Sequence, residues 1–114
     1  MKNEKFVKIS VTLHGIKAYG NTYPFRQKLK SLGFRWNPEM KCWYLEFDSV
    51  NQYALDIERD DELAHHLEEF ANELERIGFR KPDIYSLQNF YGIYAIAYEV
   101  IKQLKSAGVP VTIA

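Results

Sequence analysis

The stretch from Asn21 to Phe47 changes its hydrophobic period at Gly33, and this change limits the folds that the chain can adopt. Before Gly33 the apolar residues recur at the spacing of a helix: Phe25, Leu29 and Leu32. After it they alternate as in two short strands: Phe34 and Trp36, then Trp43, Leu45 and Phe47. Pro24 suits the first turn of a helix, and glycine commonly ends one. The pattern predicts a short helix followed by a hairpin whose turn spans residues 37–41.

A strand is predicted ahead of this helix. Residues 6–13 alternate between apolar and polar side chains, which is typical of a strand with one buried face. Residues 14–22 contain two glycines and predict a loop. The N-terminal part should therefore form a β-α-β-β unit with an antiparallel three-stranded sheet. We expect the apolar hairpin residues beneath the helix and four residues on the opposite face: Arg35, Cys42, Tyr44 and Glu46.

Two longer helices are predicted in the C-terminal half. Residues 60–77 carry one apolar stripe, with acids at the start and a glycine after the end. Residues 86–106 carry an apolar stripe beside a row of tyrosines, so this helix lies between layers or at an interface. Residues 109–113 could add a short strand, which Pro110 permits only at the edge of a sheet. Residues 48–57 fit a helix and a strand, and we favour the short helix.

The predicted fold class is α+β, a small sheet packed with two C-terminal helices. A chain of 114 residues has the usual length of one domain. We expect a single domain with a basic module over residues 1–47 and helical support over 48–114.

The two parts carry opposite charges although the net charge is +0. Residues 1–47 hold nine Lys and Arg against three acids, and residues 48–114 hold six against twelve. This asymmetry favours an anionic partner for the basic part. It equally fits an acidic helix that packs beside the basic one within the molecule.

Composition argues against a secreted or membrane protein. Cys42 is the only cysteine, so the chain has no internal disulfide. The N-terminal residues lack the apolar segment of a signal peptide, and no apolar run approaches the roughly 20 residues that span a membrane. We therefore expect a cytoplasmic protein.

Motifs for catalysis are incomplete. Residues 15–22 nearly match the phosphate-binding loop of nucleotide hydrolases, but Asn21 stands where that motif requires lysine. Glu62 and His65 have the spacing of half a carboxylate-bridged metal site whose second half is missing, and a solvated helix face explains them better. Cys42 has no histidine placed near it by any motif. We expect a protein that is not an enzyme and holds no metal or cofactor.

A weaker anion site is predicted at the start of the first helix. Backbone N–H groups there can hold a phosphate or sulfate, with Lys17 and Arg26 nearby. The candidate residues are Gly20, Asn21 and Thr22. A plain glycine loop is the alternative interpretation.

Cations and rings interleave in the N-terminal part, and this set is the main candidate site. Its members are Lys17, Tyr19, Tyr23, Arg26, Lys28, Lys30, Arg35, Lys41 and Tyr44. Cations neutralise phosphates, and rings stack on bases with little sequence preference. The alternative is that the lysines only solubilise a thin sheet. We expect both tryptophans to be core residues.

Residues 20–44 also resemble a known module. The segments Gly20–Pro24, Leu29–Glu39 and Lys41–Tyr44 are similar to a small module of phage, plasmid and archaeal mobile-element proteins, a helix followed by L-G-x-R-W-[DN]-x-x-x-K-x-W. More loosely they resemble HARP and damage-recognition-type domains of helicases, which engage branched or single-stranded DNA. The resemblance covers about a quarter of the chain and implies a β-α-β-β fold and DNA binding.

Two functional hypotheses follow. The first is a non-catalytic protein that binds single-stranded or distorted DNA through the basic and aromatic residues. The second is an adaptor or inhibitor that binds a protein partner through the acidic residues of 48–75, or forms a homodimer through the row Tyr91, Tyr94 and Tyr98.

Overall fold

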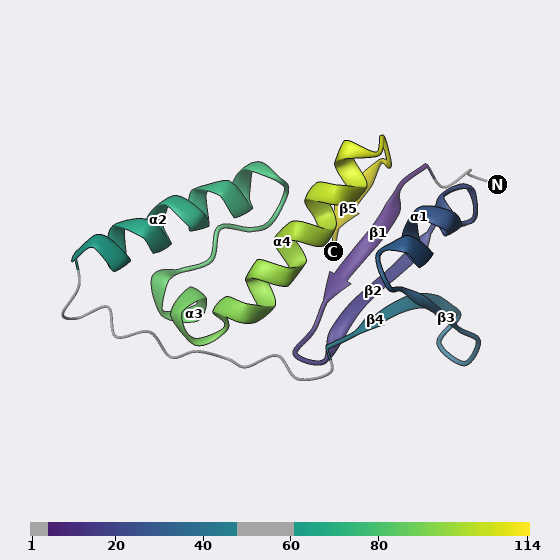
Figure 1. Cartoon of the computed structure of the whole chain (residues 1–114), viewed down its shortest axis with the longest axis horizontal. Coiled ribbons are helices and arrows are strands. Elements are labelled where there is room, and N and C mark those ends of the chain that lie inside the picture. Colours follow the sequence, from purple (N-terminus) through teal and green to yellow (C-terminus); the bar gives the residue numbers. More distant parts are fainter. Residues whose placement is uncertain (1–4, 48–60) are drawn as a thin grey trace. The chain divides into compact units, whose positions relative to one another are not determined.

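The computed structural model describes residues 5–47 and 61–114 (Figure 1). The chain divides into two compact units. Unit 1 combines residues 1–48 with Val100–Ala114, and unit 2 comprises Ser49–Glu99. The C-terminal residues therefore return to the N-terminal part, which the predicted division into 1–47 and 48–114 misses. The short helix expected over residues 48–57 lies outside the described residues.

Unit 1 is built on a mixed sheet of five strands within the described residues, where three and a possible edge strand were expected. The strands are β1 (Val7–Val11), β2 (Gly15–Gly20), β3 (Arg35–Asn37), β4 (Cys42–Glu46) and β5 (Val111–Ile113). Their order is β3-β4-β2-β1-β5, with β5 parallel to β1 and the other neighbours antiparallel. The α+β class is confirmed, and β5 lies at an edge, where Pro110 is tolerated.

The prediction of a loop over residues 14–22 is wrong for residues 15–20, which form the strand β2. Ile16 and Ala18 are buried and alternate with Lys17 and Tyr19, so the segment has the period of a strand. Its two glycines lie at the ends of the strand rather than in a loop. The turn before it is closed by Thr12, whose Oγ1 accepts hydrogen bonds from the N–H groups of residues 14 and 15.

The first helix is short and ends at a defined motif. A single turn, η1 (Tyr23–Phe25), leads into α1 (Arg26–Ser31). The N–H of Phe34 donates to the carbonyl of Leu29, and the N–H of Gly33 to the carbonyl of Lys30, both at 3.0 Å. This is the Schellman pattern, and it requires the positive φ of 101° at Gly33. Leu29 and Phe34 are both buried, as the hydrophobic contact of that motif demands.

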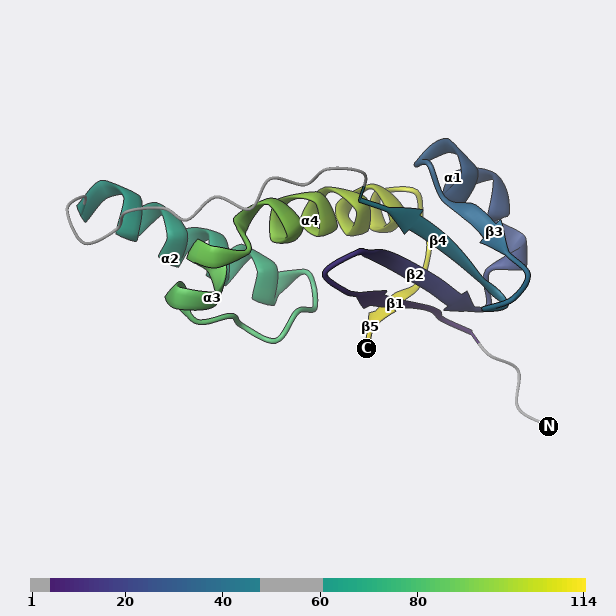
Figure 2. The ribbon, with the colours of Figure 1, turned by 90° about the horizontal axis from the view of Figure 1, so that it is seen from below.

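One face of the sheet is covered by helices of unit 1. Figure 2 shows α1 and the yellow C-terminal end of α4 (Tyr91–Ser106) on the same side of the strands. The fully buried strand residues alternate toward that side: Val7, Ile9, Ile16 and Ala18. The end of α4 adds three buried residues to this core: Val100, Ile101 and Leu104.

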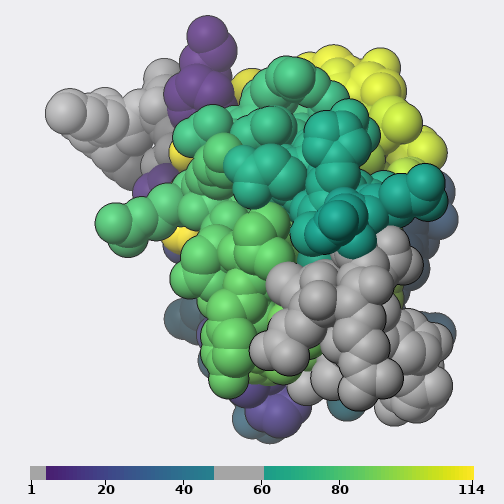
Figure 3. Space-filling model, turned by 90° about the vertical axis from the view of Figure 1, so that its left-hand side faces the viewer, coloured from purple at the N-terminus to yellow at the C-terminus, as the bar shows by residue number. Residues whose placement is uncertain are grey.

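Unit 2 is helical. The helix predicted over 60–77 is confirmed as α2 (Asp61–Arg76). The helix predicted over 86–106 is broken at Phe90 into α3 (Ile84–Asn89) and α4. The carboxylate of Asp83 accepts from the N–H of Ser86 at 2.7 Å and so begins α3 earlier than the apolar pattern suggested. In Figure 3 the teal atoms of α2 lie beside the green atoms of the segment that follows it.

Two glycines of unit 1, Gly33 and Gly108, differ in the strain that an added side chain would cause. Gly33 and Gly108 both have positive φ, but a Cβ at Gly33 would lie 3.2 Å from the Leu45 side chain, whereas one at Gly108 meets nothing within 4 Å. We predict that Gly108→Ala lowers the free energy of unfolding by about 1–2 kcal/mol through backbone strain alone. Gly33→Ala should cost more, because the leucine must also move. Urea unfolding of both variants measures the difference, and equal losses would contradict the tight contact.

Candidate nucleic-acid interface

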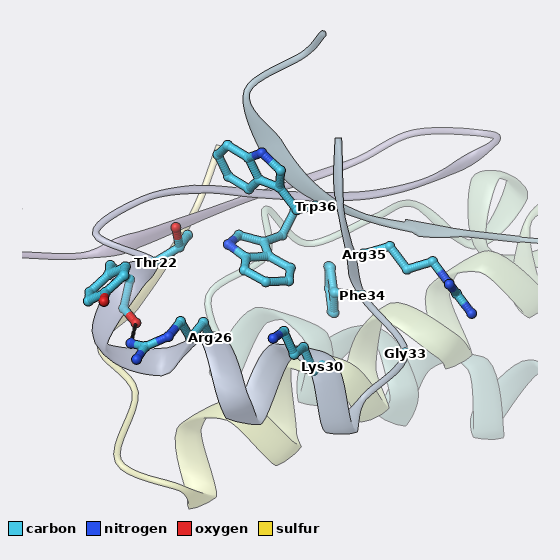
Figure 4. Close-up of a pocket in the computed structure, with 9 residues that line it drawn as sticks. Thr22, Arg26, Lys30, Gly33, Phe34, Arg35 and Trp36 are labelled. Carbon is cyan, nitrogen blue, oxygen red and sulfur yellow. Dashed lines mark hydrogen bonds between the residues drawn. The ribbon is translucent and has the colours of Figure 1, made fainter. Parts of the chain in front are cut away.

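A cleft of about 790 Å³ opens between α1 and the strand β3. Its apolar lining is Phe34, Trp36 and Trp43, and its cationic lining from the helix is Arg26 and Lys30. Figure 4 shows Trp36 across the cleft from these two cations. The volume lies in the range of about 300–1,000 Å³ that is typical of pockets for small organic groups. A flat aromatic group that carries negative charge fits this combination of walls.

The two tryptophans form a cross-strand pair. Trp36 on β3 lies directly opposite Trp43 on β4. Their ring centroids are 5.7 Å apart and their planes meet at 67°, which is the edge-to-face arrangement that aromatic rings prefer. Trp43 is 8% exposed and Trp36 is 50% exposed. One indole therefore supports the other, and the supported ring presents much of its surface to solvent.

The prediction that both tryptophans are core residues is right for Trp43 and wrong for Trp36. The reason is the sheet order, because β3 is the outermost strand on its side. A residue at an edge has neighbours on one side only, so its ring is half covered. The expectation that Cys42 and Tyr44 point away from the helix agrees with the register, since both are paired with β3 residues on the face opposite Trp43.

A second aromatic group lies at the rim of the cleft. The guanidinium carbon of Arg26 is 3.9 Å from the ring centroid of Tyr23, and its Nη1 donates to the carbonyl of Tyr23 at 2.7 Å. Tyr23 is 71% exposed. A guanidinium has five N–H donors, and this bond uses one of them. The stacked pair is thus ordered in advance while keeping donors for an anion.

The structure divides the nine predicted binding residues between two surfaces. The cleft takes four of them: Tyr23, Arg26, Lys30 and Arg35. The open face of the sheet, opposite the helices of unit 1, also takes four, because Arg35 belongs to both surfaces: Lys17, Tyr19, Arg35 and Tyr44. The remaining two, Lys28 on α1 and Lys41 in the β3–β4 turn, line neither surface.

On the open face, one row of side chains crosses three strands. Tyr44 lies opposite Lys17 of β2 on one side and opposite Arg35 of β3 on the other. A Cβ at Gly15 would come within 2.6 Å of the Tyr44 ring and 2.4 Å of the Leu45 carbonyl oxygen. Gly15 is therefore required by the close approach of Tyr44, which lies across β2 with a cation on either side.

The predicted anion site at Gly20, Asn21 and Thr22 does not have the expected donors. The N–H of Asn21 donates to the carbonyl of Phe6 at 3.1 Å, and that of Thr22 to the carbonyl of Gly20 at 2.9 Å. The helix that should supply further donors begins as a single 3-10 turn. Because the backbone groups serve the strand end, the plain-turn interpretation fits this segment, and Thr22 lines the cleft instead.

Sequence reasoning missed the aromatic floor of the cleft. It placed Phe34, Trp36 and Trp43 in the core, where only their packing would matter. The predicted β-α-β-β unit held a sign that this side is exposed. The first strand of its hairpin, residues 34–36, had no predicted partner on its outer side.

The cysteine is not placed for chemistry. Cys42 is buried, and burial raises the pKa of its thiol, while the positive charge of Lys17 acts in the opposite direction. A raised thiol pKa disfavours the reactive thiolate.

The acidic helix and the tyrosine row are engaged within unit 2. Glu68 pairs with Lys81 at 3.2 Å, and His65 pairs with Glu69 at 3.1 Å. The three tyrosines that were proposed as a dimer contact pack against the cluster of Leu67, Ala71, Leu74 and Leu87: Tyr91, Tyr94 and Tyr98. These contacts account for the row without a second copy of the chain, so binding of a protein partner stays a prediction.

In the ranges 5–47 and 61–114, no three His, Cys, Asp or Glu side chains gather where they could share a metal ion. In the same ranges no helix combines the length and apolar character needed to cross a bilayer.

Comparison of the chain with family models, curated proteins and solved structures finds no match. The similarity of residues 20–44 to the mobile-element module therefore stays a prediction.

The tryptophan pair predicts unequal effects on stability. Trp43→Ala should lower the free energy of unfolding by about 3–5 kcal/mol, because a buried ring is removed from the core. Trp36→Ala should cost only about 1 kcal/mol, mainly the lost ring–ring contact. Urea unfolding monitored by circular dichroism measures both, and a larger loss for Trp36→Ala would contradict its position at the edge.

Proposed function

We propose that the protein is a non-catalytic nucleic-acid-binding protein that accepts an unpaired base of single-stranded or distorted DNA in the cleft. The observation that supports this proposal is the half-exposed indole of Trp36, which faces Arg26 and Lys30 across the cleft. The resemblance of residues 20–44 to DNA-engaging modules points the same way.

The chemistry of the cleft suits this ligand. A base that stacks on an indole gains about 1–3 kcal/mol, whatever its sequence. Arg26 and Lys30 neutralise the phosphates that flank the base, and the free N–H donors of Arg26 fit phosphate oxygens. A paired base is enclosed in the duplex stack and has to be extruded first, so an unpaired base enters at lower cost.

Tryptophan fluorescence tests the proposal directly. Trp43→Phe leaves Trp36 as the only tryptophan. Titration of this variant with a single strand of about ten nucleotides should quench its emission, with a Kd tighter than roughly 10⁻⁴ M at low salt and weaker at higher salt. The matching duplex should bind less tightly. A Kd that ignores salt, or no change in emission, would refute the proposal.

Variants on the natural chain separate the cleft from general charge. Trp36→Ala should weaken binding roughly 5- to 150-fold, as the loss of one stacked base predicts. Arg26→Ala should reduce the slope of log K against log salt by about 0.7. Arg80→Ala is the matched control, because Arg80 is exposed and lies outside both surfaces. Equal losses for Arg26→Ala and Arg80→Ala would show that net charge, not the cleft, binds the strand.

A mononucleotide provides a further control. Its affinity should be lower than that of the longer strand, because it lacks the neighbouring phosphates. A nucleoside monophosphate that binds as tightly as the oligonucleotide would identify a small-molecule site instead.

A further inference from the structure

Two hollows share three lining residues, one just before the edge strand β3 and two within it. The cleft and a second hollow of about 660 Å³ are both lined by Gly33, Arg35 and Trp36. The second hollow, called the edge hollow here, is also lined by Tyr44, which belongs to the open face. In Figure 4 the side chains of Arg35 and Trp36 leave β3 in opposite directions. The two surfaces are therefore separated by the width of β3 alone.

The open face carries positive charge where it meets the edge hollow. Arg35 is exposed, and Lys17 and Tyr44 are half-buried in the same cross-strand row. Neighbouring strands are about 4.8 Å apart, which places Lys17 and Arg35 on the order of 10 Å from each other with a ring between them. Within the described part of the chain, neither cation is paired with a carboxylate.

Acidic side chains lie at one border of this positively charged surface. Glu39 and Glu46 line the edge hollow, and Glu46 lies opposite Gly15 beyond the row of Tyr44. Their charge disfavours phosphates on that side and favours them along the row of Lys17 and Arg35.

We propose that one single strand of nucleic acid crosses the edge of the sheet, with a base against Trp36 in the cleft and its following nucleotides along the Lys17, Tyr44 and Arg35 row. This inference rests on the proposed function and extends it to a second surface. The occupant is an unpaired strand because duplex DNA has a persistence length of about 50 nm and does not bend around one β-strand. A flexible single strand follows such a turn readily, and Tyr44 offers it a second ring for stacking.

Oligonucleotide length tests the crossing on the unmodified protein. Affinity should rise from the dinucleotide to a strand of about four nucleotides or more, the lower size of single-strand sites, and only slowly beyond that. Anisotropy of end-labelled thymidine strands measures the series. A plateau already at the dinucleotide would overturn the inference and leave the cleft proposal intact.

A variant of one cation on the open face, with a matched control, locates the second surface. Lys17→Ala should leave dinucleotide binding unchanged, because Lys17 does not line the cleft, and should lower the salt slope of longer strands by about 0.7, the value for one phosphate. Its control is Lys28→Ala, which removes one cation of unit 1 that lines neither surface. Glu46→Gln should strengthen the binding of longer strands.

The outcomes separate the inference from the proposed function. Equal slopes for Lys17→Ala and Lys28→Ala would overturn the crossing while Trp36→Ala still weakens every length. If no strand of any length binds the natural protein, the crossing and the proposed function both fail.

Discussion

The reversal of the chain at Gly33 is the constraint on which the cleft depends. Two backbone hydrogen bonds end α1 there and send the chain directly into β3. Leu29 and Phe34, which one of these bonds joins, are both buried, and this closed turn fixes how the strand leaves the helix. The helix that carries Arg26 and the strand that carries Trp36 are thereby held on opposite sides of one opening. A different end to this helix would leave the same side chains without a shared cavity.

The cross-strand register then gives similar residues different tasks. Trp43 is covered by its neighbours and supports the sheet, whereas Trp36 uses that buried ring as its own support. Tyr44 has a comparable position on the other face, where Gly15 leaves room for its ring. Rings held by rigid partners lose little conformational entropy when a ligand stacks on them, which favours recognition by stacking over recognition by flexible polar groups.

Local patterns predicted the individual helices and strands of this chain better than they predicted which of these elements lie next to one another. The change of period at Gly33, the apolar stripe of α2 and the edge strand limited by Pro110 were all visible in the sequence. The strand β2 was hidden because glycines at both of its ends imitate a loop, and β5 was recognised without its partner β1. Pairing between distant segments decides which strand is outermost, and no local pattern carries that information.

The same limit explains why the site was predicted only in part. The cations and tyrosines were found by composition, but their division into a cleft and an open face depends on strand order. Trp36 was assigned to the core because a large apolar ring is usually buried, and only the edge position of β3 reverses that expectation. The anion site failed for a related reason, since the N–H groups of Asn21 and Thr22 are used to close the end of β2.

The passage of α4 through both units has a consequence for how the chain is organised. Residues 91–99 belong to the helical unit, and residues 100–106 belong to the core beneath the sheet. The sheet unit is therefore discontinuous in sequence. The helical unit is inserted between β4 and the last turns of α4, which belong to the sheet unit. A fragment cut after β4 lacks Ile101, Leu104 and the strand that pairs with β1. The smallest piece that keeps the whole sheet has to join two separate segments of the chain.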